Sequence, residues 1–341
     1  MPYTTTQQQP IATEFTAAST VDDVLAGIDL SGRNVVITGG HTGLGREMTR
    51  ALSRAGAAVT VAARNPTKAA AALDDIPGVE THRLDLVDPD SIDAFVTHFL
   101  GTGRPLHILI NNAGIMGGAL ARDNRGYEYH FAANHLGHFQ LTNGLLPALR
   151  AAGGARVVTM TSGGHRLTDI RWDDPNFEHS EYDGHIAYGQ SKTANVLFTV
   201  ELDRRWSADA IRGYAVHPGI IVTTNLGPAR GAGEDPTFSA EWMQMLRSQG
   251  LLDDDGNAVI APELGLKTPE QGASTAVFAA TSPLLADIGG VYLKDNDVAP
   301  VDDTPPTTEF DGPPPTDVAP HAIDPASAQR LWSMSEQLLS A

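Results

Sequence analysis

The chain has 341 residues, of which 41% are hydrophobic, enough for one large α/β domain with extensions. It contains no cysteine, which excludes disulfides and thiolate metal sites and permits a reducing compartment. Acidic residues outnumber basic ones 41 to 23, and the formal charge of −18 argues against nucleic acid or an anionic membrane as a partner.

The first twenty residues are polar and carry neither a basic start nor an apolar run. We therefore expect residues 1–20 to form a flexible arm and not a signal peptide. No apolar run approaches the ~20 residues that a membrane span needs, so the expected location is the cytoplasm. Residues 21–30 show helical spacing of Val21, Val24, Leu25 and Ile28 before Ser31-Gly32 interrupts the chain.

Apolar runs then alternate with helical patterns from residue 34 to residue 293. This alternation predicts a single doubly wound (Rossmann-type) α/β fold, a parallel sheet with helices on both faces, within a domain spanning residues 21–298. The expected strands are 34–38, 58–63, 81–86, 106–111, 155–161, 212–216 and 290–293. The expected helices are 47–55, 66–73, 91–100, 127–149 and one that contains Tyr188 and runs to about Trp206.

Two segments depart from the alternation. Residues 220–265 form an expected lid insertion, with Phe238, Trp242, Met243, Met245 and Leu246 on one helix. These apolar side chains would either roof an apolar pocket or pack the insertion onto the sheet, and the pattern favours neither. Residues 299–341 combine a stretch with seven prolines (299–320), which should be extended, and a short C-terminal helix.

A glycine-rich turn follows the first expected strand and opens the first helix of the alternation. Glycines there let the backbone turn sharply and approach a pyrophosphate at the helix N-terminus. The spacing is Gly-x3-Gly-x-Gly, and the predicted cofactor contacts are Gly39, His41, Thr42, Gly43, Leu44 and Gly45.

The end of the second expected strand indicates which dinucleotide is preferred. An acidic residue there would bind the ribose 2′-hydroxyl of NAD, but Ala63 occupies the position and Arg64 follows it. An arginine suits a 2′-phosphate, so we predict a preference for NADP(H), with NAD(H) left open. Asp85 and Leu86 end the third strand, where the carboxylate of Asp85 would meet an adenine edge or cap the next helix.

Tyr188 and Lys192 stand four residues apart in a chain with only four lysines. This spacing puts both side chains on one face of a helix. A positive charge near a phenol favours the phenolate, which makes Tyr188 a candidate general acid/base for a carbonyl or an alcohol. On spacing alone, a surface tyrosine packed on a lysine stem would explain the pair equally well.

Taken together, the motifs resemble those of the short-chain dehydrogenase/reductase family, in particular the subgroup of retinol dehydrogenases and WW-domain oxidoreductases. The resemblance covers about residues 30 to 300. It is carried by Thr38–Gly45, Asn111-Asn112-Ala113-Gly114, Asn134-His135-Leu136-Gly137-His138-Phe139, Thr161-Ser162, Tyr188/Lys192 and His217-Pro218-Gly219.

The resemblance implies a role for each matching position. Tyr188 would exchange a proton with the substrate oxygen, Lys192 would bind the nicotinamide ribose and lower the Tyr188 pKa, and Ser162 would bind the substrate oxygen. Asn134 would hold a water that joins Lys192 to solvent. The remaining cofactor contacts would be Asn112, Ala113, Gly114, Pro218, Gly219, and Thr223 or Thr224 on the carboxamide.

The sequence thus predicts an NADP(H)-preferring oxidoreductase that interconverts a small-molecule carbonyl and alcohol, with a hydrophobic ketone, aldehyde or secondary alcohol as substrate. One alternative is a regulatory module that binds the nucleotide without turnover. Another is epimerisation or dehydration, which needs an extra base. The helix of Tyr188 and Lys192 would pair in a homodimer or homotetramer unless the extensions block it.

The twelve histidines invite a metal site, but His135 and His138 lack carboxylates or thiols at ligand spacing, and we predict no metal. His165 and His185 flank the expected pocket and are candidates for substrate contact. Tyr182 is a rival phenol, but it has no lysine one turn away.

Overall fold

The computed structural model describes residues 6–340 except for 225, 227–243, 245 and 306–314. Its described strands form one eight-stranded sheet in the order β3-β2-β1-β4-β5-β6-β7-β8, parallel except for the β7–β8 pair. The predicted doubly wound α/β fold is confirmed. The strands are β1 Asn34–Thr38, β2 Ala58–Ala63, β3 Val79–Arg83, β4 Ile108–Asn111, β5 Ala155–Met160, β6 Ile211–Val216, β7 Val291–Lys294 and β8 Asp297–Val298.

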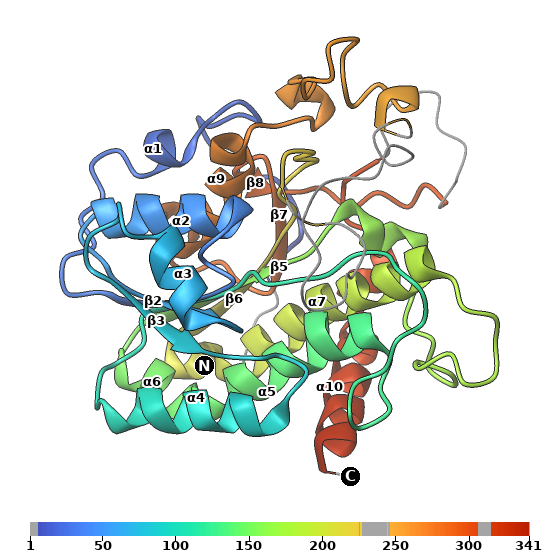
Figure 1. Cartoon of the computed structure of the whole chain (residues 1–341), viewed down its shortest axis with the longest axis horizontal. Helices are drawn as coiled ribbons and strands as arrows, with labels where there is room; N and C mark the ends of the chain where they lie inside the picture. The colour runs from blue at the N-terminus through green and yellow to red at the C-terminus, as the bar shows by residue number, and fades with distance from the viewer. Residues whose placement is uncertain (1–5, 225, 227–243, 245, 306–314, 341) are drawn as a thin grey trace.

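Helices cover both faces of the sheet (Figure 1). The described α-helices are α1 Val21–Val24, α2 Gly43–Arg54, α3 Pro66–Ala72, α4 Pro89–Gly101, α5 Gly137–Gly144, α6 Leu146–Ala151, α7 Gly184–Trp206, α9 Pro269–Thr281 and α10 Pro325–Ser340. Strand β1 shows why both faces are filled: Val35 and Ile37 pack toward α2 and α9, whereas Val36 packs toward α4 and α5. Period-two alternation therefore places apolar side chains in two separate cores.

The expected helix over residues 127–149 is interrupted. Residues Phe131–Leu136 form a π-helical turn (η1), followed by α5 and α6. Pro147 lies in the first turn of α6 and has no N–H to continue the hydrogen bonding of α5. Gly137 packs so tightly on the backbone of Leu86 that any side chain would collide with that carbonyl.

Other boundaries also differ from the prediction. Helix α9 was not expected, because its buried positions are small residues such as Gly272 and Ala273 that give no apolar stripe, although Thr268 and Gln271 form a capping box. Strand β3 ends at Arg83, so Asp85 and Leu86 follow it and do not end it. Phe238, Trp242, Met243 and Met245 lie outside the described residues, and Leu246 is buried.

The described part of the expected N-terminal arm, residues 6–20, has no helix or strand but is anchored beside β7 and β8. The Gln8 amide donates to the carbonyls of Tyr292 (2.8 Å) and Ala299 (2.6 Å) and accepts from the Tyr292 N–H (2.9 Å). The Asp297 carboxylate accepts from the Ile11 N–H at 2.9 Å. Backbone groups at this edge of the sheet are therefore satisfied by the arm.

The C-terminal helix α10 packs against α7 (Figure 1). The Trp332 ring stacks on Phe198 of α7 with centroids 5.7 Å apart, and its edge contacts Phe139 and Trp206. Leu197 and Leu331 share a neighbouring apolar cluster. Helix α10 thus covers part of α7, the helix expected to pair in a homo-oligomer, and the oligomeric state stays a prediction.

Candidate active site

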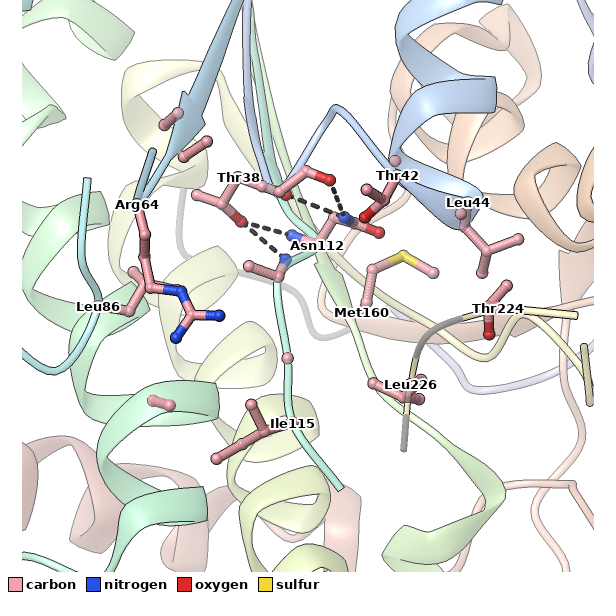
Figure 2. A pocket seen from close by; sticks show the side chains of 18 of the residues that line it. Thr38, Thr42, Leu44, Arg64, Leu86, Asn112, Ile115, Met160, Thr224 and Leu226 are labelled. Carbon is pink, nitrogen blue, oxygen red and sulfur yellow. Dashed lines mark hydrogen bonds between the residues drawn. The ribbon is translucent and has the colours of Figure 1, made fainter. Parts of the chain in front are cut away.

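One cleft, with a volume of about 380 Å³, lies at the carboxyl ends of β1, β2, β4, β5 and β6 (Figure 2). Strand order reverses between β1 and β4, which is where ligands bind in doubly wound sheets. With one exception, Thr223, every predicted cofactor contact lines this cleft, and so does Ser162. The predicted contacts there are Gly39, His41, Thr42, Gly43, Leu44, Gly45, Arg64, Asp85, Leu86, Asn112, Ala113, Gly114, Tyr188, Lys192, Pro218, Gly219 and Thr224.

The glycine-rich turn has the shape that a phosphate group requires. Gly39 and Gly43 have φ angles of 66° and 51°, in the left-handed region that favours glycine. A side chain on Gly45 would collide with the Gly39 carbonyl, so the backbone can fold this tightly only with glycine there. Helix α2 begins at Gly43, and its N-terminal N–H groups open on the cleft.

The Thr38 hydroxyl connects the glycine-rich turn to the next wall of the cleft. Thr38 Oγ1 accepts from the backbone N–H groups of Asn112 and Ala113, both at 2.9 Å, and the Asn112 amide donates to the Thr38 carbonyl at 2.9 Å (Figure 2). Because both lone pairs of Oγ1 are used, its proton must be donated to Nε2 of His138, 2.9 Å away.

His138 extends this hydrogen-bond network to the π-helical turn. Since its Nε2 accepts, its proton sits on Nδ1, which donates to the Asn134 carbonyl at 3.0 Å. Burial lowers the pKa of His138 to about 4, which keeps the imidazole neutral. Sequence reasoning left the function of His138 unassigned, although the motif that carries it was recognised.

Basic side chains gather beyond the end of β2. Arg64 and Lys68 are exposed, and in the part of the chain that the structure describes neither forms an ion pair. Burial, with Lys68 and Arg64 nearby, lowers the pKa of His41. Nδ1 of His41 is buried without a hydrogen-bond partner among the described residues. This corner of the cleft is suited to an anion.

Asp85 also lines the cleft. Its carboxylate accepts from the Val87 N–H at 3.3 Å, which closes a local turn. Asp88, and not Asp85, caps α4, because its side chain accepts from the Ser91 N–H at 3.3 Å. The capping alternative for Asp85 is therefore wrong.

Tyr188 and Lys192 lie one helical turn apart on α7, and both are buried. Nζ of Lys192 is 5.5 Å from the centroid of the Tyr188 ring and donates to the Met160 carbonyl at 3.2 Å. Burial raises the pKa of Tyr188 to about 12, against a smaller lowering by a hydrogen bond from Ser162. Burial also lowers the pKa of Lys192 to about 8.

The expected lowering of the Tyr188 pKa is therefore not seen. Removing a phenolate from water costs more than the hydrogen bond with Ser162 returns, and Lys192 does not offset that cost. The phenol is the stable form at neutral pH in the protein alone, which is the form that can donate a proton.

Ser162 is oriented by its own loop. Its Oγ accepts from the Gly164 N–H at 3.1 Å, which leaves the hydroxyl proton for an acceptor on the cleft side, where the Tyr188 hydroxyl lies within hydrogen-bonding reach. The backbone at Ser162 is extended and leads into a short 3₁₀ turn, η2 Gly163–Leu167.

Asn134 does not line the cleft but lies fully buried behind it. Its amide accepts from the Ile115 N–H at 2.9 Å and donates to the Ile115 carbonyl at 3.0 Å and to Ser191 Oγ at 2.9 Å. Both amide protons are thus in use, and the side chain fixes Ile115 in the wall of the cleft. The water relay through Asn134 stays a prediction.

Some of the remaining candidate site residues line the cleft and others do not. Thr224 reaches the cleft and contacts Gly43, whereas Thr223 does not line it. His165 is fully buried, with both ring nitrogens bonded to backbone, so its expected contact with substrate is wrong. His185 is exposed and does not line the cleft. The Tyr182 hydroxyl donates to the buried carboxylate of Glu128 at 3.1 Å, and burial raises its pKa.

Several lining residues were missed by sequence reasoning. Met160 and Thr161 precede Ser162 at the end of β5, and Ile115 follows the Asn-Asn-Ala-Gly motif, so their position in the chain could have identified them. Ala133 lies in the π-helical turn and Tyr129 just before it, and both precede the recognised motif that begins at Asn134.

Within the described ranges, no group of three or more histidine, aspartate or glutamate side chains is placed to hold a metal ion. None of the helices described is both long enough and apolar enough to cross a membrane.

Comparison with known proteins gives three consistent likenesses. The family model for short chain dehydrogenases matches residues 33–233. A protein from Streptomyces lividans named "Probable oxidoreductase" is 43% identical over 92% of this chain and 100% of its own length. Retinol dehydrogenase 12 of Bos taurus is 36% identical over 92% of this chain and 88% of its own length.

Two solved structures are also similar to this chain. The crystal structure of an uncharacterized protein from Mycobacterium Paratuberculosis is 32% identical, with a TM-score of 0.67 and coverage of 96% of this chain and 98% of that one. A short-chain type dehydrogenase/reductase from Mycobacterium marinum is 23% identical with a TM-score of 0.58, covering 79% and 96% of the two chains, and it shares the fold.

Proposed function

The chain belongs to the short-chain dehydrogenase family and is an NAD(P)-dependent oxidoreductase, and from this premise we propose that it interconverts a hydrophobic carbonyl compound and its alcohol with NADP(H) as the preferred cofactor. The observation that carries the proposal is that Tyr188, Lys192 and Ser162 open on the same cleft as the glycine-rich turn. A substrate oxygen can therefore meet the phenol next to the dinucleotide.

The bound cofactor would supply or accept the hydride at the substrate carbon. In the reducing direction, the Tyr188 phenol donates its proton to the carbonyl oxygen as that oxygen becomes negatively charged. Ser162 donates a hydrogen bond to the same oxygen with the proton that its loop leaves free. The Lys192 ammonium stabilises the phenolate that remains on Tyr188. In oxidation the proton moves from the alcohol to Tyr188.

The preference for NADP(H) is supported by the basic corner of the cleft. Arg64 lines the cleft, and Ala63 before it offers no carboxylate to a ribose 2′-hydroxyl. Lys68 adds a second positive charge whose effect on the pKa of His41 shows that these groups are close together. A 2′-phosphate would satisfy these charges, whereas NAD would leave them without an anion.

An apolar substrate is supported by the opposite end of the cleft. The side chains of Ile115, Met160 and Leu226 line the cleft, and Figure 2 shows Met160 and Leu226 on the side away from Arg64. Leu226 is 39% exposed, so an apolar ligand would cover it. The retinol dehydrogenases among the relatives are named for an apolar alcohol, which makes retinoids suitable members of a test panel.

The test is a panel of apolar aldehydes, ketones and alcohols, retinal and retinol included, assayed with both cofactors. We expect NADPH-dependent turnover of at least one apolar carbonyl and loss of that turnover in Tyr188→Phe and Ser162→Ala. Tight NADPH binding without turnover of any compound would favour the regulatory module instead. Substantial turnover by Tyr188→Phe would exclude the proposed acid/base role.

A further inference from the structure

Two stretches near the C-terminus lie against the loop that carries Ser162. We name them the strap, defined as residues 299–305 and 315–323. Val301 and Val318 form a parallel bridge between the two stretches. The backbone carbonyl of Thr316 accepts from the Tyr292 hydroxyl at 2.8 Å, and its Oγ1 accepts from Lys294 Nζ at 3.3 Å. A side chain added at Gly163 would lie 3.3 Å from the Thr316 methyl group, so the strap touches the residue that follows Ser162.

Arg166, in the same loop as Ser162, holds both stretches of the strap. Its guanidinium donates to the carbonyls of Asp302 (3.1 Å), Thr304 (2.9 Å) and Asp317 (2.8 Å), and pairs with the Asp302 carboxylate at 3.1 Å. The Arg166 side chain is only 5% exposed. A buried arginine that satisfies three carbonyls makes a rigid connection, because releasing any one of them would leave a buried donor unpaired.

His165 connects the strap to Ser162 itself. The Ala319 N–H donates to Nε2 of His165 at 3.0 Å, so Nε2 carries the lone pair and Nδ1 carries the proton. Nδ1 then donates to the Ser162 carbonyl at 2.7 Å. Burial lowers the pKa of His165 to about 3, consistent with this neutral form. A second link comes from Nε2 of His321, which donates to the His165 carbonyl at 3.0 Å.

We propose that the strap is part of the active site and fixes the position of the Ser162 hydroxyl, with His165 as the positioning residue that links the two. The proposal rests on the catalytic role proposed for Ser162. The hydroxyl must meet a substrate oxygen within hydrogen-bond distance, and a shift of even 1 Å would weaken that bond. Packing of the loop on α7 alone would not need a polar link from Ala319 to the Ser162 carbonyl.

Two substitutions of His165 separate its two hydrogen bonds. In His165→Asn the amide N–H can take the place of Nδ1 and keep the bond to Ser162, while the bond to Ala319 is lost. In His165→Gln the amide oxygen can take the place of Nε2 and keep Ala319, while the Ser162 carbonyl loses its side-chain donor and keeps only the backbone N–H of residue 165, at 3.1 Å. His179→Gln is the matched control, because His179 is exposed.

We expect His165→Gln to lower kcat by ~10-fold or more with the Kd for NADPH unchanged, and His165→Asn to lose only a few-fold. Arg166→Ala should lower kcat by a few-fold, no more than His165→Asn does, because it loosens the strap that His165 links to Ser162. It should cost less in a His165→Asn background, where that link is already broken. Equal kcat losses in the two His165 variants, or full additivity with Arg166→Ala, would overturn the proposal.

Two further measurements distinguish failure of the positioning role of His165 from failure of the proposed function. Imidazole ¹⁵N chemical shifts should identify the Nδ1-protonated form of His165, and a doubly protonated ring or an Nε2-protonated one would overturn the network without any activity assay. Ser162→Ala tests the underlying function: if it keeps full kcat, the proposed function fails. If it loses activity while His165→Gln does not, the function stands and the positioning role fails.

Discussion

The ammonium of Lys192 lies 5.5 Å from the centre of the Tyr188 ring, and burial moves the pKa values of the two groups in opposite directions. The pKa of Tyr188 rises to about 12, and the pKa of Lys192 falls to about 8. Near neutral pH the pair is therefore a phenol beside an ammonium, which is the proton-donating form. Before any cofactor adds its own charge, Tyr188 thus holds the proton that carbonyl reduction would require.

The first prediction concerns the pH dependence of reduction. As pH rises through about 8, Lys192 loses its charge and stops stabilising the phenolate that forms on Tyr188. We expect kcat for carbonyl reduction to be steady below this pH and to fall above it, while Tyr188 stays protonated. Lys192→Gln should abolish the inflection and lower kcat at every pH. An unchanged inflection in that variant would assign it to another group.

The same shift predicts how stability depends on pH. The folded pKa of Lys192, about 8, lies below the unfolded value of 10.5, so the unfolded chain binds more protons between these values. The contribution of Lys192 therefore makes the protein more stable as pH rises from about 8 to 10.5. Lys192→Met should remove this contribution. Chemical denaturation of both proteins at several pH values measures the difference.

The second prediction is the loss of the acid/base group. Tyr188→Phe should lower kcat by ~10³-fold, because general acid catalysis contributes about that much. The phenyl ring keeps the packing against Gly164 and His130, so NADPH binding and the melting temperature should change little. The control is Tyr182→Phe, whose hydroxyl is bonded to Glu128 and does not line the cleft. A comparable loss in both variants would contradict the assignment.

The sequence predicts the parts of this site that a local residue pattern encodes, and it does not predict the parts that depend on contacts between distant residues. The glycine-rich turn and the Tyr188–Lys192 spacing are local, and the cleft contains both as expected. The bond between His165 and Ala319 joins residues 154 positions apart, and no local pattern encodes it. The pKa of Tyr188 was expected to fall and instead rises, because burial is a property of the packed fold.

Helix α9 shows a different limit. Its side chains are small because it packs closely on the sheet and on Ile221, which lies within 3 Å of a side chain added at Gly272. Close packing removed the large apolar residues on which helical periodicity depends. The cap formed by Thr268 and Gln271 was present in the sequence and would have identified the helix.

The third prediction tests the cofactor preference. Arg64→Ala should raise the Kd for NADPH by ~10–100-fold, as expected for loss of a charge-assisted hydrogen bond, and leave the Kd for NADH nearly unchanged. Lys68→Ala should act in the same direction with a smaller effect. Arg33→Ala is the control, since Arg33 is exposed just before β1, at the opposite end of the strand from the cleft. Equal weakening of both cofactors by Arg64→Ala would remove the basis for the preference.

The fourth prediction concerns Thr38. Its hydroxyl accepts from two backbone N–H groups and donates to His138. Thr38→Val therefore leaves the Ala113 N–H and Nε2 of His138 without these partners, while the Asn112 N–H keeps the Ile110 carbonyl at 3.0 Å. We expect a loss of ~2–3 kcal/mol in the free energy of unfolding and weaker NADPH binding, because Asn112 and Ala113 line the cleft. Thr38→Ser keeps the hydroxyl and should restore most of both. If Thr38→Ser lost as much stability and NADPH binding as Thr38→Val, the retained hydroxyl would not restore either property, and the role assigned to its hydrogen bonds would be contradicted.

The last prediction concerns the cover that α10 places on α7. Trp332 is 3% exposed and packs on Phe139, Phe198 and Trp206. Trp332→Ala should lower the free energy of unfolding by ~3–5 kcal/mol, the usual cost of removing a large buried aromatic ring. It should also uncover apolar surface on α7 and promote self-association, which size-exclusion chromatography at several concentrations would detect. Trp172→Ala is the control, because that ring is only half-buried beside Arg330. If both variants were equally stable and the Trp332 variant did not associate, α10 would not be what keeps this face of α7 from other copies of the chain.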